Sequence, residues 1–402
     1  MYSIYMRSTG RADLPLHTGT VPKWLADRMM QLGTLIVESL VTNFGRDEVL
    51  VRLSDPLWFQ SFGAVMGMDW HSSGITTSVM YALKRGLNPR AHELGICVCG
   101  GRGKYSRRTP DELKYICDAS GLNGDELIRA SKLSAKVDNT AVQDGYQLYQ
   151  HNFVLSIDGS WAVVQQGMNP AQKAARRYHW CSKNLRSFTE EPHAAVVGEN
   201  SGDILNLVSK DASPVRGRLV DFAQQEPQLI LGEIQKMQNT LPFLDSRDCV
   251  MPTHHEVRKE DVDTKRLGAV LTSAYTAQTK DFESLLLTPG LGPRTLQSLT
   301  LVSEVMYGTP SRFTDPARYS FAHGGKDGHP FPVPLKIYDE SIRVLRESIE
   351  KSKLGYTDKS DCIKRLHNTA LTIEKNFNPD ADFDKAIAFE REHSAEWGGK
   401  TV

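Results

Sequence analysis

The chain has 402 residues, of which 40% are hydrophobic, and its 48 basic residues balance 48 acidic ones. A chain of this length buries a large core and commonly divides into two domains. The balanced charge excludes a protein that coats nucleic acid along its whole surface, so any DNA contact is expected to be local and modest in salt dependence.

The same composition predicts a cytoplasmic protein that makes no membrane contact. No hydrophobic run reaches membrane-spanning length, and the first residues contain no apolar signal core. The six cysteines are scattered, and Cys97-x-Cys99 has no matching CxxC pair, so we expect reduced core thiols. The sequence identifies no protein partner.

Helices are expected in the first part of the chain. Pro22 lies near the start of an apolar-periodic segment that ends at Gly45. Asp55-Pro56 begins a second helix, and a third is expected over residues 75–85. An abrupt polar cluster at 67–74 separates the last two.

A buried strand over residues 94–101 ends in the glycine-rich turn 100–104. Glycines beside basic residues bring backbone amides close to a phosphate, although the spacing of a P-loop is absent. The segment Thr109-Pro110-Asp111-Glu112 is typical of a capping box that begins a helix ending near Gly121. A further helix is expected over 125–136.

From His151 to Gly167 the hydrophobic period changes from 3.6 to 2. Apolar residues alternate on both sides of Asp158-Gly159, which predicts a β-hairpin. Pro170 is then expected to begin a helix that contains Arg176-Arg177-Tyr178-His179-Trp180, and residues 194–197 form another short strand.

Strand signals disappear after about residue 214. We therefore predict an α+β fold, with a mixed α/β catalytic domain at 1–212 and an all-helical DNA-binding domain at 213–402. The irregular segment of the second domain, 314–330, is too rich in glycine for a helix. Its amphipathic helices are expected over 229–241, 264–278, 285–308 (interrupted by a turn), 338–353, 360–377 and 383–393.

The turn inside 285–308 is the strongest functional signal. Its two glycines permit positive φ, and Pro293 stands at the first position of the second helix. Free backbone N–H groups and the positive end of the helix dipole would then form an anion site. The segment resembles the helix-hairpin-helix motif of DNA repair and replication proteins, and the alternative is an ordinary αα-hairpin. The DNA contacts expected here are Pro289, Gly290, Leu291, Gly292, Arg294 and Thr295.

Six segments together resemble a prokaryotic family catalogued as domain of unknown function 763. The resemblance covers nearly the whole chain and implies a family without an activity. Arg102 departs from the lysine expected in the glycine turn. The segments are ADLPLHTG (12–19), RLSDPLWFQ (52–60), DWHSSG (69–74), VQDGYQLYQH (142–151), WAVVQQGMN (161–169) and ARRYHW (175–180).

A local resemblance to helix-hairpin-helix DNA glycosylases implies another role for the same region. Those enzymes carry an aspartate a short loop beyond the second helix, close to Asp315 here. Arg294 stands where bifunctional members have lysine, which argues against Schiff-base lyase chemistry. A glycosylase that uses the aspartate alone needs no cofactor. Asp315-Pro316 is equally typical of a helix N-cap.

Polar residues concentrate where the predicted strands and helices end. Strand ends leave a crevice in which side chains meet without crossing the core. We therefore expect one convergent polar site at the edge of the mixed domain. Its candidate residues are Asp69, His71, Lys104, Lys136, Asp138, Asp144, His151, Gln165, Arg177, His179, His193 and the pair His254-His255.

Metal-dependent hydrolysis of a DNA strand is the favoured chemistry. Asp69, Asp138 and Asp144 would hold Mg²⁺ or Mn²⁺, which polarises a phosphodiester and lowers the pKa of a water. Lys104, Lys136 or Arg177 would stabilise the developing charge. The nuclease signature Asp…(Glu/Asp)-x-Lys is missing, because the strand sequence there is VVQQGM. Local turn chemistry is the alternative role for Asp138 and Asp144.

Two further hypotheses remain open. In a glycosylase, Gln165 and Gln166 would bind an extruded base beside aromatic residues such as Trp70, Tyr146 or Trp180. In a non-catalytic DNA-binding adaptor, the mixed domain would recognise a partner or a DNA structure. Independently of these hypotheses, the alternative for Arg176-Arg177 is a solvated helix face. The prediction is DNA processing in repair, by a nuclease ahead of a glycosylase or an adaptor.

Overall fold

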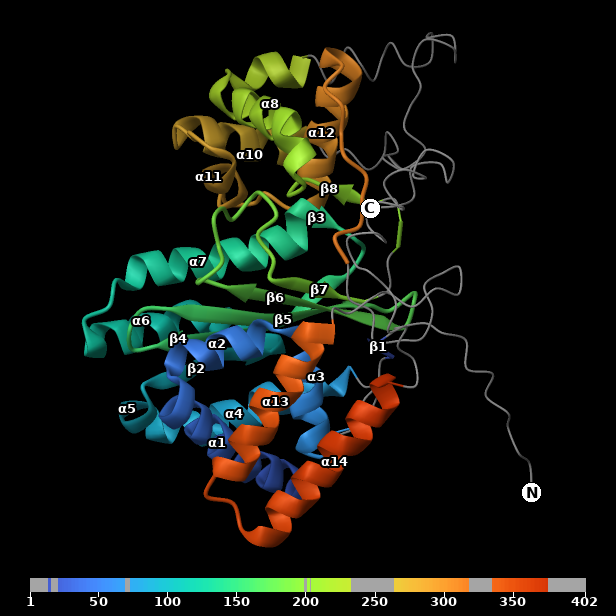
Figure 1. Ribbon diagram of the computed structural model, residues 1–402. Coiled ribbons are helices and arrows are strands. Elements are labelled where there is room, and N and C mark those ends of the chain that lie inside the picture. The colour runs from blue at the N-terminus through green and yellow to red at the C-terminus, as the bar shows by residue number, and fades with distance from the viewer. Residues whose placement is uncertain are drawn as a thin grey trace.

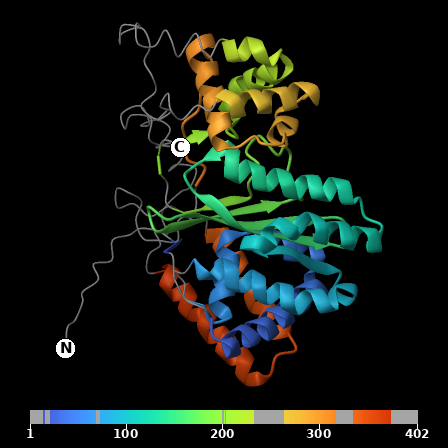
Figure 2. The ribbon, with the colours of Figure 1, turned by 180° about the vertical axis from the view of Figure 1, so that it is seen from behind.

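A computed structural model describes residues 14–15, 21–68, 73–198, 201–202, 204–232, 264–317 and 335–374. This part of the chain has a mixed α+β fold, in which helices cover both faces of an antiparallel sheet (Figure 1). The view from behind shows the same layers (Figure 2). The predicted α+β class is confirmed.

The strand order of the sheet is β1-β6-β5-β4-β2, and β7 also pairs with β6. In its register, His151 lies opposite Gln165, and Gln165 lies opposite Tyr178. Directly opposed side chains of antiparallel strands point to the same face. The strands are β1 (Leu14–Pro15), β2 (Ile96–Arg102), β4 (Gln147–Ser156), β5 (Trp161–Asn169), β6 (Ala174–Cys181) and β7 (Ala195–Val197), and β3 (Val142–Gln143) pairs separately with β8 (Leu205–Asn206).

The predicted β-hairpin is confirmed, and the helix predicted after it is wrong. Strands β4 and β5 flank Asp158-Gly159, where Gly159 has φ +82°, a value that glycine adopts without strain. Residues Ala174–Cys181 form strand β6, which is buried along its whole length. A strand buried on both faces lacks the alternation of polar and apolar residues that identifies a half-buried one. Arg176-Arg177 is therefore not a solvated helix face.

One face of the sheet is covered by helices from both ends of the chain. Ile36 of α1, Phe62 of α3 and Leu345 of α13 share a hydrophobic cluster with Val154 and Val164 of the sheet. The helices of this layer are α1 (Lys23–Phe44), α2 (Arg46–Ser54), α3 (Pro56–Val65), α4 (Gly74–Leu87), η1 (Asn88–Arg90), α5 (Ala91–Leu94), α13 (Leu335–Lys351) and α14 (Tyr356–Glu374).

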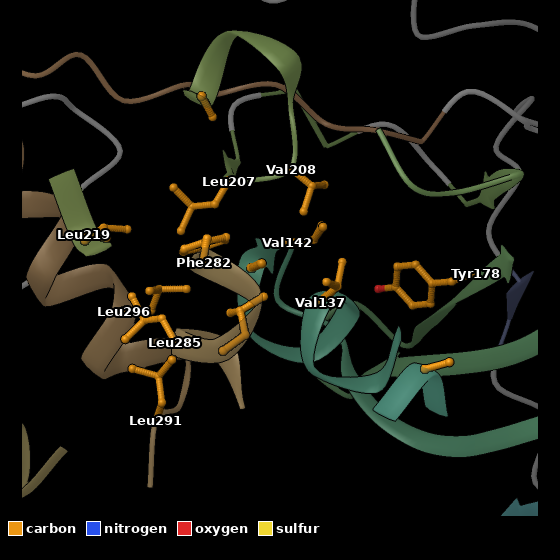
Figure 3. Packing of buried hydrophobic residues seen from close by; sticks show 14 of the residues in the cluster. Val137, Val142, Tyr178, Leu207, Val208, Leu219, Phe282, Leu285, Leu291 and Leu296 are labelled. Carbon is orange, nitrogen blue, oxygen red and sulfur yellow. The ribbon is translucent and has the colours of Figure 1, made fainter. Parts of the chain in front are cut away.

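The opposite face packs against a second hydrophobic cluster. Figure 3 shows Leu219, Phe282 and Leu285 of this cluster, and Leu291, from the turn before α12, belongs to it as well. The helices of this layer are η2 (Gly103–Arg108), α6 (Thr109–Ser120), α7 (Gly124–Lys136), the π-helical turn η3 (Val137–Ala141), η4 (Lys210–Ala212), α8 (Ser213–Gln224), α10 (Thr264–Thr276), α11 (Phe282–Leu286) and α12 (Pro293–Tyr307).

The predicted division at residue 212 stays a prediction, but the packing of the described residues crosses it. Leu296 of α12 belongs to the cluster above the sheet, whereas Leu345 of α13 belongs to the cluster below it. The helices of 213–402 therefore contribute to two different layers. The helix predicted over 383–393 and residues 318–330 of the irregular segment lie outside the described residues.

Local end signals explain several helix boundaries. Gly45 ends α1 at φ +89°, and the Asp55 side chain accepts hydrogen bonds from the N–H groups of Leu57 and Trp58 at the start of α3. The predicted capping box is wrong, because Thr109 donates to Ser106 O and Glu112 pairs with Lys84. Helix α2 was not expected.

The predicted pair of helices around the glycine turn is present as α11 and α12. Gly290 has φ +83°, and Gly292 caps α12 without a side-chain hydrogen bond. Pro289, Gly290 and Pro293 are exposed, whereas Leu291 is buried and Gly292 is half-buried. No helix in the described ranges has the length and apolarity needed to cross a membrane.

Candidate functional site

Polar side chains gather at one end of the sheet, where β2 and β5 end and β4 and β6 begin. Gln150-His151, Gln165-Gln166 and Arg176-Arg177 are buried there on three neighbouring strands. Successive residues of a strand point to opposite faces, so each pair places one side chain on each face. Buried polar networks therefore form on both sides of the sheet.

On the face toward α7, four side chains form a hydrogen-bonded row that we call the serine network: Ser131, His151, Gln165 and Asp138. Ser131 Oγ lies 2.9 Å from His151 Nε2, and His151 Nδ1 lies 2.7 Å from Gln165 Oε1. The Gln165 amide nitrogen donates to Ser134 O at 3.0 Å and to Asp138 Oδ2. The row thus runs from α7 across the sheet to η3.

The partners of Gln165 fix the proton positions in this row. Its NH₂ group faces two acceptors, Ser134 O and the Asp138 carboxylate, so its Oε1 must face His151. His151 Nδ1 therefore carries the proton and donates it to Gln165. In the neutral ring, Nε2 then holds a lone pair, which accepts a hydrogen bond from the Ser131 hydroxyl.

Asp138 anchors the far end of the serine network. Its Oδ2 also accepts a hydrogen bond from Trp180 Nε1 at 3.0 Å, and its Oδ1 lies 2.5 Å from His193 Nε2. Donors from β5, β6 and the loop before β7 thus converge on one fully buried carboxylate. Its partners are distant in sequence, so local turn chemistry does not account for Asp138.

On the opposite face lies an arginine network made of Gln60, Thr76, Arg177 and His179. Arg177 Nε donates to His179 Nε2 at 2.8 Å, and Arg177 Nη2 donates to Gln60 Oε1 at 2.9 Å. Burial lowers the pKa of Arg177 to about 9. Burial, and then the Arg177 charge, hold the pKa of His179 well below its ordinary value. All four side chains are fully buried.

A third cluster centres on Arg176. Its guanidinium makes a bidentate pair with Asp315 at 2.9 and 2.7 Å and contacts Asp144 at 3.0 Å. Burial lowers the pKa of Arg176, but the two carboxylates outweigh burial and the net shift is upward. Burial raises the pKa of Asp144 despite Arg176 and the Tyr178 hydroxyl, which donates at 2.6 Å.

The predicted metal site does not assemble from the residues described. Asp69, His71 and the pair His254-His255 lie outside them. Asp138 and Asp144 stand in different clusters, because Arg176 holds Asp144 while Trp180 and Gln165 hold Asp138. No group of three potential metal ligands from His, Cys, Asp and Glu occurs in the described ranges. Asp144 also accepts from Tyr146 N, as its predicted turn role requires.

The sequence predicted one convergent polar site, but the sheet divides its residues between two faces. His151, Asp138, Gln165 and His193 do come together, whereas Arg177 and His179 lie on the other face. Two lysines lie apart from both networks. Lys104 Nζ lies 5.5 Å from the centre of the Tyr105 ring, and Lys136 Nζ donates to Leu291 O at 2.6 Å.

The residues predicted to bind an extruded base already contact other residues of the protein. Gln165, Gln166 and Trp180 are fully buried and hydrogen-bonded, and Arg176 lies 4.7 Å from the Tyr146 ring centre. Trp70 lies outside the described residues. Asp315 accepts bonds from the N–H groups of Ser201 and Ala317 in addition to Arg176, so its oxygens face protein donors.

A pocket of about 220 Å³ reaches the open end of the serine network. Ser131 and His151 form part of its wall, and the arginine network lines no part of it. Sequence reasoning missed Ser131, although a serine on the apolar face of the predicted helix 125–136 was a visible signal. The lining residues are Ser106, Arg107, Pro110, Ser131, Lys132, Ala135, Leu148, Gln150 and His151.

Two exposed cations, Arg107 and Lys132, line this pocket. Together with the exposed Arg102, Lys104 and Arg108 and the half-buried Lys136, they form what we define as the basic surface. In the described part of the chain, no carboxylate lies within ion-pair distance of any of them. Tyr105 stands among them, is 47% exposed, and lies beside the charged groups of Lys104 and Arg108 at 5.5 and 5.4 Å.

The basic surface continues to the turn before α12. Lys132 and Lys136 are one helical turn apart on α7, and Lys136 reaches the turn through Leu291 O. Gln143 Nε2 donates to Pro293 O at 2.9 Å. Arg294 is exposed, whereas Thr295 is buried. The Gly100 amide is not free for a phosphate, because it donates to Glu112 at 2.8 Å.

The chain belongs to the family described as protein of unknown function (DUF763), whose sequence model matches residues 10–333. This match confirms the family resemblance seen in the sequence. No curated protein and no solved structure matches the chain. The resemblance of the α11–α12 segment to DNA repair motifs therefore stays a prediction.

Proposed function

We propose that this member of the DUF763 family binds DNA along its basic surface and processes the bound strand. The observation that carries the proposal is the basic surface, two of whose cations line the 220 Å³ pocket and none of which has a carboxylate partner in the described residues. In a chain with no net charge, such a local concentration of cations favours a polyanionic partner.

Tyr105 favours a single strand over a duplex. An exposed aromatic ring among cations is typical of surfaces where bases stack and the backbone phosphates pair with Lys or Arg. The charged groups of Lys104 and Arg108 lie over this ring, 5.5 and 5.4 Å from its centre, so a base that stacks on Tyr105 brings its phosphates close to two cations.

The turn before α12 supplies a second contact in this proposal. No side chain caps the first amides of α12, and the turn is exposed at Pro289 and Gly290. A helix N-terminus of this kind binds a phosphate oxygen in helix-hairpin-helix proteins. Lys136 joins the turn to α7, so a strand crossing both would pass the pocket.

Strand processing is favoured over a purely adaptor role by the serine network at the pocket wall. A metal-dependent mechanism at Asp138 and Asp144 is less favoured, since these carboxylates serve separate clusters. Base excision by Asp315 is less favoured as well, because Arg176 binds both of its oxygens. A role in DNA repair is the biological setting that this proposal implies.

Binding of a fluorescein-labelled single-stranded oligodeoxynucleotide tests the proposal. Fluorescence anisotropy should show binding that weakens with salt, and Arg107→Ala/Lys132→Ala should reduce affinity on the order of ten-fold at physiological salt. The matched control is Lys114→Ala, which removes an exposed lysine of α6 that pairs with Asp118. Absence of binding by the natural protein, or equal affinity for all three proteins, would overturn the proposal.

A further inference from the structure

The serine network has one end inside the protein and one end at the pocket. Ser131, in the middle of α7, is buried against His151 and still contributes to the pocket wall. Ser134, one turn further along the same helix, is equally buried and lines no part of that pocket; its hydroxyl donates to Ser131 O at 3.1 Å. Of these two serines, only Ser131 places its hydroxyl beside a histidine lone pair and also forms part of a pocket wall.

We propose that the pocket is a hydrolytic site in which Ser131 Oγ attacks a phosphate ester and His151 Nε2 accepts its proton. The activated serine follows from the serine network itself. The choice of a phosphate ester rests on the proposed DNA binding, so the two parts are tested separately.

The geometry fulfils the requirements for an activated hydroxyl. A nucleophile needs a base within hydrogen-bond reach, and the base needs a third group that fixes its tautomer and orientation. Ser131 Oγ and His151 Nε2 are 2.9 Å apart, and Gln165 Oε1 holds the Nδ1 proton at 2.7 Å. An amide takes this third position in the Cys-His-Asn proteases.

Asp138 acts behind Gln165 as a positioning residue. Its carboxylate and Ser134 O hold the Gln165 NH₂ group, which prevents the amide from turning its nitrogen toward His151. The Trp180 indole and the His193 ring in turn hold Asp138. Gln165 therefore holds His151, Asp138 holds Gln165, and Trp180 and His193 hold Asp138.

Burial keeps His151 in the form that acts as a base. It lowers the pKa of His151 below its ordinary value, although the Gln165 hydrogen bond and the Asp138 charge oppose the shift. The ring is therefore neutral at pH 7, with its lone pair on Nε2. A neutral, oriented imidazole beside a hydroxyl is the arrangement that general-base catalysis requires.

Two cations line the pocket in which negative charge would develop. Arg107 from η2 and Lys132 from α7 both contribute to its wall. When an oxygen nucleophile attacks phosphorus, charge accumulates on the non-bridging oxygens, and fixed cations stabilise it. Lys132 follows Ser131 directly in the chain, so the nucleophile and a stabilising charge share one helix.

The reaction balances with water as the only co-reactant. The Ser131 Oγ–P bond forms while its proton passes to His151 Nε2. The bond from phosphorus to the leaving oxygen breaks, and that oxygen takes the proton from His151. Water then attacks phosphorus and gives its proton to Nε2, the Oγ–P bond breaks, and Oγ recovers a proton.

A fluorophosphonate probe tests the activated serine without DNA. Attack by Ser131 would form an Oγ–P bond, release fluoride and add a defined mass, which intact-protein and peptide mass spectrometry locate. We expect one adduct, on Ser131, that is absent in Ser131→Ala. Labelling of His151→Gln should be slower by at least about 100-fold, the lower range for loss of a general base.

Matched serines provide the controls. Ser106→Ala removes another hydroxyl of the pocket wall, one that donates to Gly103 O, and should label at the natural rate. Ser131→Cys keeps a nucleophile at the same position, and iodoacetamide should alkylate it faster than in Ser131→Cys/His151→Gln. A natural protein that gains no adduct at Ser131, or that labels equally after His151→Gln, would overturn the proposal.

The ester class is decided by two chromogenic substrates in EDTA. Hydrolysis of bis(p-nitrophenyl) phosphate that is lost in Ser131→Ala supports the phosphate assignment. Hydrolysis of p-nitrophenyl acetate alone would overturn that assignment and leave the activated serine standing. Neither assay depends on the oligonucleotide binding measurement, so failure of DNA binding is distinguishable from failure of the serine chemistry.

Discussion

The two faces of the sheet carry polar networks built by alternate residues of the same strands. On one face, Gln165 and His151 connect to Ser131 and a pocket. On the other, Gln166, Arg177 and His179 connect to Gln60 and Thr76 and are fully enclosed.

The two faces show what distinguishes a structural buried histidine from one that can act as a base. Both His151 and His179 are neutral rings with lowered pKa values, and both donate from Nδ1 to a fixed acceptor. The Nε2 of His179 accepts from Arg177, a charged group that it cannot activate. The Nε2 of His151 faces a hydroxyl beside a pocket. The partner of the lone pair, and not the pKa alone, separates a structural role from a chemical one.

The largest effect is expected where an enclosed charge cluster is broken. Arg176→Met leaves Asp144 and Asp315 buried without their cation and should lower the free energy of unfolding by about 3–5 kcal/mol. Arg177→Met, in the next position of the strand, leaves no described carboxylate unpaired and should cost less. Urea denaturation of both variants measures the difference, and equal losses would contradict the contrast between these two arginines.

Acid should weaken the protein through both buried histidines. Their folded pKa values lie below the value of about 6.5 for the unfolded chain, so the unfolded state takes up protons first as the pH falls. The stability that depends on the two neutral rings is complete well above pH 6.5 and is lost as the pH falls below that value, by at most about 2–3 kcal/mol for the pair at about pH 5.5.

Variants isolate this contribution from the other titrating groups. His179→Gln should reduce the loss between pH 7.5 and 5.5 by about 1 kcal/mol, because one proton-binding difference disappears. Urea denaturation at the two pH values provides the comparison. A pH dependence identical to that of the natural protein would show that the pKa of His179 is the same in the folded and unfolded states, which contradicts the lowered folded value.

Removing the hydroxyl at the open end should cost little stability. Ser131→Ala takes one hydrogen bond from His151 Nε2, which is worth about 1 kcal/mol. Ser134→Ala also removes one hydrogen bond and should cost about as much. Thermal unfolding should therefore place the two variants together, while fluorophosphonate labelling separates them. If both variants lost labelling, the loss would be due to altered packing of α7 and not to the missing Ser131 hydroxyl.

The smallest stability effect is expected on the basic surface. Arg107→Ala/Lys132→Ala removes exposed cations without described ion pairs and should change the free energy of unfolding by less than about 0.5 kcal/mol. The same variant should lower the slope of log affinity against log salt by about 0.7 for each lost phosphate contact on a single strand. A large stability loss would give these side chains a structural role.

The features that depend on neighbouring residues could be predicted from the sequence. Periodicity was sufficient for the hairpin β4–β5 and for most helices, and Asp55 marked the start of α3. It also grouped Asp138, His151 and Gln165 near the strand ends. These features depend on neighbouring residues or on a single period.

The remaining features depend on register and on layers. Strand β6 was mistaken for a helix because its two faces are both buried, and arginines occupy core positions that sequence patterns assign to solvent. Whether Arg177 and Gln165 share a site is decided by which face each strand residue occupies, a one-residue distinction. Ser131 joined the site only through its distance to a histidine twenty positions away.

In the proposed function, the basic surface and the serine pocket form one site. The most direct test measures fluorophosphonate labelling of Ser131 with and without saturating single-stranded oligodeoxynucleotide, at a salt concentration where anisotropy confirms binding. We predict that bound DNA slows labelling several-fold in the natural protein and that the slowing is lost in Arg107→Ala/Lys132→Ala. Unchanged labelling with DNA bound would show that the strand and the serine belong to different sites.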